Sequence, residues 1–143
     1  MLPPEYDGWP ENPTHTLCLC IEEIAKACAS SALLLIIQAV GSYPLIFAGT
    51  EAQKKKYCPM ISDERRLIGY LVTEPGAGSD VQAIRSAAIR SGNDFILNGR
   101  KVFATNGSVA GIYSVLAKTG EKKLSFFYCG KGSQGHFNRQ NRG

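Results

Sequence analysis

The feature that most constrains this chain of 143 residues is an apolar run that ends abruptly in a turn rich in glycine, hydroxyl and carboxylate groups. Residues 67–72 read as a strand, and residues 73–80 follow as Thr-Glu-Pro-Gly-Ala-Gly-Ser-Asp. Glycines allow positive φ and let a ligand approach the main chain closely. Successive amides in such a turn can bind an anion, and Ser and Thr hydroxyls add donors. An ordinary strand-to-strand turn uses the same residues, so the turn alone leaves both interpretations open.

Past this turn, short apolar runs alternate with turn residues. The pattern predicts strands over residues 86–90, 95–97, 100–105, 112–118 and 124–129. Asn98-Gly99 predicts a two-residue hairpin before the third of these runs, because both residues tolerate positive φ. Regular short strands separated by turns favour an antiparallel sheet or a barrel-like domain.

The first 66 residues carry a helical pattern instead. Apolar residues recur at helical spacing at Ile21, Ile24, Cys28 and Leu35. Thr50 and Gln53 form the pattern of a capping box at the start of a further helix, and Gly49 closes the helix before it. Residues 32–37 are apolar all round, which is typical of a helix buried in a bundle.

A transmembrane span is the alternative for this apolar stretch. A span needs about 20 predominantly apolar residues, whereas this one is interrupted at Gln38, Gly41, Ser42 and Pro44. Residues 1–13 are rich in proline and acidic side chains and do not read as a signal peptide. We therefore expect no membrane partner.

The charge is distributed unevenly along the chain. Residues 1–66 carry six Lys/Arg and eight Asp/Glu, a net charge of −2, whereas residues 67–143 carry ten and four, a net charge of +6. A basic β half suits a pyrophosphate or a CoA phosphate. The positive residues are scattered, so we expect no nucleic-acid partner. The five cysteines lack the paired Cys-x-x-Cys spacing of a zinc site, and we expect no metal.

Two blocks of the sequence resemble the flavin-binding middle domain of acyl-CoA dehydrogenases. Residues 70–80 are similar to one signature of that family, and residues 97–107, Leu-Asn-Gly-Arg-Lys-Val-Phe-Ala-Thr-Asn-Gly, to the strand that carries its flavin-contacting aromatic-x-Thr. Residues 4–8 and 47–57 resemble parts of the family's N-terminal helical domain. The resemblance therefore covers nearly the whole chain.

The resemblance implies an α+β fold in two incomplete domains. Residues 1–66 would form part of the N-terminal helical domain, and residues 67–143 part of an antiparallel β-barrel-like middle domain. The family's longer chains add a C-terminal helical domain, so this chain is expected to be a fragment. We expect it to be inactive by itself, because the family's catalytic base, a Glu or Asp, comes from that C-terminal domain and would lie beyond Gly143.

The same resemblance implies FAD as the cofactor and assigns residues to it. The residues expected to bind FAD are Tyr70, Leu71, Val72, Thr73, Gly78, Ser79, Phe103, Ala104 and Thr105. Thr73 would donate to the flavin edge near N5 and O4, where negative charge develops on the reduced ring. Ser79 would also lie beside the acyl-CoA. The family commonly has Trp where this chain has Phe103, and a β-branched residue where it has Ala104.

No catalytic residue is assigned within this chain. Glu74 lies in the signature turn and is a candidate for the base, but its charge would oppose negative charge on the reduced ring. We expect Glu74 instead to accept hydrogen bonds that hold the turn.

The implied reaction is oxidation of the Cα–Cβ bond of an acyl-CoA thioester. The implied partners are the acyl-CoA substrate, an electron-transferring flavoprotein as acceptor, and further copies of the chain in a dimer or tetramer. The implied location is the bacterial cytoplasm or the mitochondrial matrix. Two alternatives stay open: a non-catalytic binding or interaction module without flavin, and an acyl-CoA oxidase-type relative, which shares the middle-domain signature.

Overall fold

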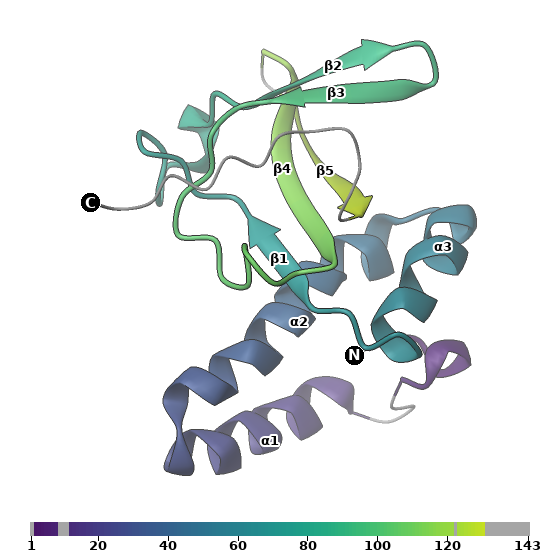
Figure 1. The fold of residues 1–143 in the computed structure, drawn as a ribbon, viewed down its shortest axis with the longest axis vertical. Helices are drawn as coiled ribbons and strands as arrows, with labels where there is room; N and C mark the ends of the chain where they lie inside the picture. Colours follow the sequence, from purple (N-terminus) through teal and green to yellow (C-terminus); the bar gives the residue numbers. More distant parts are fainter. Residues whose placement is uncertain (1, 9–11, 122, 131–143) are drawn as a thin grey trace.

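The computed structural model describes residues 2–8, 12–121 and 123–130 (Figure 1). Its helices are α1 (Pro13–Ala27), α2 (Ala29–Ala48) and α3 (Glu51–Ser62), with short 3-10 turns η1 (Pro4–Tyr6) and η2 (Val81–Ala83). Its strands are β1 (Ile68–Leu71), β2 (Ala87–Ser91), β3 (Asp94–Asn98), β4 (Ile112–Gly120) and β5 (Lys123–Gly130). The predicted order of helices followed by strands is confirmed.

Strand β4 is the centre of the sheet. It pairs antiparallel with β5 along one edge, and parallel with β1 along the other, where Ile68 lies opposite Ile112. Further along, Lys118 of β4 meets Ala87 of β2, again in parallel, and β2 forms a hairpin with β3. The sheet therefore mixes parallel and antiparallel pairs where an antiparallel sheet was expected.

The hairpin predicted at Asn98-Gly99 and the strand predicted over residues 100–105 are wrong. The hairpin turn lies between β2 and β3, where Ser91 pairs with Asp94, and residues 99–111 form no strand. Gly99 instead packs against Ser86, where an added Cβ would stand 2.0 Å from the hydroxyl oxygen. Glycine here allows a close approach, and the following residues continue toward the turn at residues 73–80.

Helices α1 and α2 are joined by a break at Cys28. This residue has an extended backbone, with φ −156° and ψ 107°, and its side chain is exposed. Its amide still donates to the Ile24 carbonyl, and its carbonyl accepts from the Ala32 amide. Cys28 therefore links the ends of two helices, and the single helical spacing predicted from Ile21 through Cys28 to Leu35 is interrupted there.

Helix α2 packs across the start of β1. The cluster that joins helices to sheet consists of Leu45, Tyr57, Cys58, Ile68 and Ile112. Gly41 lies so close to Ile68 that an added Cβ would meet its Cγ2 at 2.4 Å. The Gln38 side chain accepts from the Ile68 amide at 2.5 Å and donates to the Arg66 carbonyl at 3.2 Å. These contacts fix where β1 begins.

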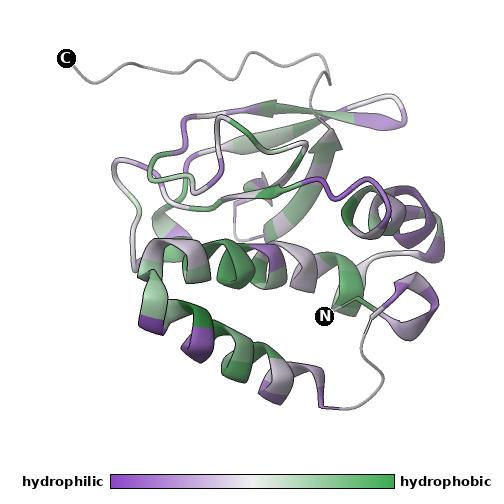
Figure 2. Ribbon diagram, turned by 60° about the horizontal axis from the view of Figure 1, so that its bottom comes forward, coloured by the Kyte–Doolittle hydropathy of each residue, from purple (hydrophilic) through white to green (hydrophobic). Residues whose placement is uncertain are grey.

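The apolar stretch of α2 is only partly covered. Leu33 and Leu34 are 41% and 40% exposed, whereas Ala39 is buried. Figure 2 shows hydrophobic residues along much of the helix. Helix α2 has the length and composition of a membrane span, with a mean hydropathy of 1.8, but the core helix of a soluble protein meets the same criterion. The prediction that residues 32–37 are buried on all sides does not hold within the described residues.

Candidate functional site

The end of β1 anchors the turn on both faces of the sheet. Leu71 is 4% exposed and lies in a cluster with Tyr113 and Val115, against which Ala104 packs. Val72 packs on the opposite cluster, which is formed by Ala77, Ile84 and Leu116. Consecutive side chains of an extended chain point to opposite faces, so Leu71 packs on one face of the sheet and Val72 on the other. The position of Thr73 is thereby fixed.

The two sequence blocks that resemble the family signatures lie side by side. The Val102 amide donates to the Thr73 carbonyl at 2.9 Å. The Lys101 ammonium donates to the Val72 carbonyl at 2.9 Å. Residues far apart in the sequence thus form one surface around Thr73.

Glu74 is the buried centre of this junction. One carboxylate oxygen accepts from the Lys101 ammonium at 2.9 Å and from the Ser86 amide at 2.9 Å, and the other from the Arg85 amide at 2.7 Å. Burial alone would raise the pKa of Glu74, but hydrogen bonds from Ser86, Arg85 and Lys101 outweigh it and lower the pKa to about 2. The expectation that Glu74 accepts hydrogen bonds that hold the turn is confirmed. A carboxylate so engaged is a poor proton acceptor near pH 7.

The turn itself is closed on one side and open on the other. The Glu74 and Ala77 backbones exchange two hydrogen bonds, at 3.0 and 3.1 Å, and Ala77 is 3% exposed. Gly78 and Ser79 are exposed, and a Cβ added to Gly78 would meet no atom within 4 Å. A ligand can therefore approach the main chain here without displacing any described side chain.

Phe103 follows Val102, whose amide is bonded to the Thr73 carbonyl. It is 76% exposed, and its backbone has φ +55°. A bulky residue at positive φ is uncommon, and such backbone strain concentrates at functional sites. Asn106, also at positive φ, donates its side-chain amide to the Ile68 carbonyl at 3.1 Å. This bond ties the loop that carries Phe103 and Thr105 to β1.

Thr73 carries donors that the described residues leave unused. Its carbonyl accepts from Val102, but neither its amide nor its hydroxyl makes a hydrogen bond within the described part of the chain. Thr73 is half-buried, so these donors remain accessible to a bound group. Two donors without a partner in the described residues, an exposed aromatic residue at Phe103 and open space over Gly78 are compatible with a flavin bound near this surface.

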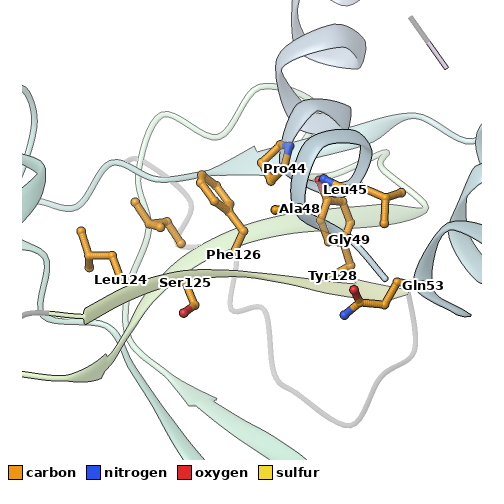
Figure 3. A pocket seen from close by; sticks show the side chains of 10 residues that line it. Pro44, Leu45, Ala48, Gly49, Gln53, Leu124, Ser125, Phe126 and Tyr128 are labelled. Carbon is orange, nitrogen blue, oxygen red and sulfur yellow. The ribbon is translucent and has the colours of Figure 1, made fainter. Parts of the chain in front are cut away.

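A separate hollow of about 530 Å³ lies between the end of α2 and strands β4 and β5 (Figure 3). It is lined by Pro44, Leu45, Ala48, Gly49, Gln53, Leu116, Leu124, Ser125, Phe126 and Tyr128. No residue predicted to bind FAD lines it, although Tyr70 stacks on Phe126 with ring centroids 5.8 Å apart.

The sequence interpretation missed Lys101. Lysines are common on surfaces, and nothing in the local pattern indicates that this one pairs with a carboxylate 27 residues earlier. The signal that could have indicated its importance was its place within residues 97–107, the second stretch that resembles the family, directly after Arg100. Only the fold shows that it is buried.

Comparisons with known proteins agree with the resemblance. Residues 1–65 match the model for the acyl-CoA dehydrogenase N-terminal domain, and residues 69–142 that for the acyl-CoA dehydrogenase middle domain. The chain is 53% identical over 137 residues to cyclohexane-1-carbonyl-CoA dehydrogenase of Syntrophus aciditrophicus (strain SB), a match that covers 93% of this chain and 36% of that protein.

Solved structures share the fold. One, described as an electron transferring flavoprotein of Acidaminococcus fermentans, has a TM-score of 0.84 at 34% identity and covers 93% of this chain and 36% of that chain. An acyl-CoA dehydrogenase from Bacillus anthracis, complexed with FAD, has a TM-score of 0.82 at 32% identity over 94% of this chain and 23% of that chain. FAD, the predicted cofactor, is thus present in a structural relative. With both domain models matched, this chain belongs to the acyl-CoA dehydrogenase family.

Proposed function

We propose that this chain forms the flavin-facing part of a longer FAD-dependent dehydrogenase that acts on cyclohexane-1-carbonyl-CoA or a closely similar alicyclic acyl-CoA. The reaction would remove a proton from Cα and a hydride from Cβ of the thioester, leaving a C=C bond. FAD, when bound, supplies the hydride acceptor. The observation that carries the proposal is Thr73, which lies in the first signature block and is bonded through its carbonyl to Val102 of the second, while its amide and hydroxyl make no hydrogen bond within the described residues. The alicyclic substrate is supported by the 53% identity to the Syntrophus enzyme.

The residues of this chain would bind and orient the cofactor. Thr73 would donate to the flavin edge, and the exposed Phe103 ring would offer an apolar face to the ring system. The open turn at Gly78 and Ser79 would let a phosphate-bearing chain approach the main chain. The net charge of +6 on residues 67–143 favours such anionic groups.

The base for the α-proton would come from outside residues 1–143. Glu74 is already neutralised by Lys101 at 2.9 Å and has a pKa lowered to about 2, so it would hold the turn and leave the proton to another group. We therefore propose that residues 1–143 alone have no dehydrogenase activity.

The partners of the whole protein are part of the same proposal. An electron-transferring flavoprotein would reoxidise the enzyme, and the chain would assemble as a dimer or tetramer. Its location would be the bacterial cytoplasm or the mitochondrial matrix.

The test is anaerobic titration of the full-length protein, loaded with FAD, with acyl-CoA thioesters. Cyclohexane-1-carbonyl-CoA should bleach the visible flavin absorbance faster than butyryl-CoA or octanoyl-CoA. Bleaching by the straight-chain thioesters only would overturn the alicyclic assignment. A well-folded full-length protein that takes up no FAD would favour the non-catalytic module, and rapid peroxide formation in air would favour an oxidase.

A further inference from the structure

Lys101 occupies an unusual place for a lysine. Its side chain is 8% exposed, and its ammonium group donates at 2.9 Å both to the Val72 carbonyl and to the carboxylate of Glu74, whose side chain is 6% exposed. A buried ammonium is costly unless it is paired and hydrogen-bonded. Here both conditions are met, and one of the two acceptors belongs to the main chain immediately before Thr73.

The bond to Val72 fixes the orientation of the next amide. The described residues contain no cis peptide bond, so the Val72 carbonyl and the Thr73 N–H point in opposite directions from one planar group. With the carbonyl held on Lys101, the Thr73 N–H must point away from Lys101. The bond from the Val102 amide to the Thr73 carbonyl fixes the following peptide in the same way.

The packing of the neighbouring side chains does not by itself hold the Val72 carbonyl. Leu71 packs on one face of the sheet and Val72 on the other, which sets the path of the chain but not the rotation of the peptide that follows it. Lys101 supplies that missing constraint from a separate segment.

We propose that Lys101 is a positioning residue, which turns the Thr73 amide and hydroxyl toward FAD by holding the Val72 carbonyl and the Glu74 carboxylate. The Lys101 ammonium is engaged by Val72 and Glu74, so its influence on the cofactor would pass through Thr73. The inference rests on the proposed function, because it gives the unused Thr73 donors their target.

The test uses the full-length protein and four variants: Lys101→Met, Thr73→Ala, the double variant, and Lys54→Met as the control. Lys54 is also a partly buried lysine, 19% exposed, in an ion pair of 3.1 Å with Glu51 on α3. The flavin reduction potential is measured by equilibration with a reference dye, the FAD dissociation constant by fluorescence, and the melting temperature on the apoprotein.

Lys101→Met should lower the flavin potential and raise the FAD dissociation constant about tenfold, whereas Lys54→Met should change neither. The double variant should shift the potential by less than the sum of the single shifts, because the part of the Lys101 effect that acts through the Thr73 hydroxyl is already absent in Thr73→Ala. Independent sites would give additive shifts. A purely structural Lys101 would change the melting temperature and leave the potential of the loaded protein at the wild-type value.

An unchanged potential in Lys101→Met, or additive shifts in the double variant, would overturn the positioning role. If Lys101→Met does not fold, Glu74→Gln serves in its place. This substitution weakens the ion pair that holds Lys101 but keeps the shape of the residue 74 side chain. It should lower the flavin potential, as Lys101→Met would. An unchanged potential in Glu74→Gln would then overturn the role. If the wild-type protein binds no FAD, both the proposed function and this inference are overturned. If acyl-CoA reduces the wild type but the variants keep its flavin potential, only this inference is overturned.

Discussion

The hydroxyl of Tyr128, on β5, bridges the turn of α2 that contains Pro44. It accepts from the Leu45 amide at 3.1 Å and donates to the Gly41 carbonyl at 2.5 Å, two groups that are i and i−4 partners in a helix. Proline within a helix removes a donor and strains the ladder around it. A side chain inserted at that point satisfies the loosened groups. The main chain of Tyr128 also accepts from the Tyr57 hydroxyl at 2.8 Å, so both α2 and α3 are tied to β5.

Tyr128→Phe should therefore destabilise the protein with little change in packing. It removes a hydroxyl that makes two hydrogen bonds, and leaving a buried amide and carbonyl short of a partner costs about 1–3 kcal/mol. Urea denaturation of the full-length protein measures the loss. Tyr6→Phe is the matched control, because the Tyr6 hydroxyl makes no hydrogen bond to the described residues. Equal stabilities of the two variants would contradict the bridging role.

The Glu74 carboxylate should make stability depend on pH in the acid range. Its pKa is about 2 in the folded protein against an ordinary value of 4.5, so folding favours the charged form. The stabilisation is complete above about pH 5 and is lost as the pH falls toward 2, with a total of about 3 kcal/mol.

Glu74→Gln should lower stability at pH 7 and flatten the loss of stability between about pH 5 and 2. Urea denaturation over this range measures both effects. Glu121→Gln, at an exposed position after β4, is the control and should keep the wild-type profile. A wild-type slope in Glu74→Gln would show that other carboxylates carry the acid dependence.

Local chemistry in the sequence predicted the elements that depend on neighbours in the chain. The capping box at Thr50 and Gln53 is confirmed, with the Gln53 amide bonded to the Thr50 hydroxyl at 3.2 Å and the return bond at 2.8 Å. Alternation and turn residues likewise placed β4 and β5 within two residues of their ends. Each of these signals is complete within a few consecutive residues.

The errors arose where distant residues decide the conformation. Asn98-Gly99 has the chemistry of a hairpin, but Gly99 is used for its contact with Ser86. The parallel pairing of β1 with β4 joins segments about forty residues apart, which turn signals do not reveal. The pairing of Lys101 with Glu74 is hidden for the same reason. The assignment of individual residues to FAD stays a prediction, which the next two experiments address.

Phe103→Ala should weaken FAD binding. Phe103 is 76% exposed, so its ring is accessible to a ligand. An aromatic contact is worth about 0.5–1.5 kcal/mol, which corresponds to a rise in the FAD dissociation constant of roughly two- to tenfold. Phe47→Ala is the control, because Phe47 is equally exposed, at 79%, but lies on α2. An unchanged dissociation constant in Phe103→Ala would remove Phe103 from the site.

Thr73→Ala should leave FAD bound but lower its reduction potential and slow its reduction by acyl-CoA. The substitution removes one donor and keeps the Leu71 and Val72 anchors and the glycines of the turn. A hydrogen bond to a charged group is worth about 1.5–3 kcal/mol, and the reduced flavin should lose more than the oxidised form. Ser91→Ala, at the exposed end of β2, is the control. If Thr73 only terminates β1, Thr73→Ala would lower the melting temperature and keep the wild-type potential, and Thr73 would leave the list of FAD-binding residues.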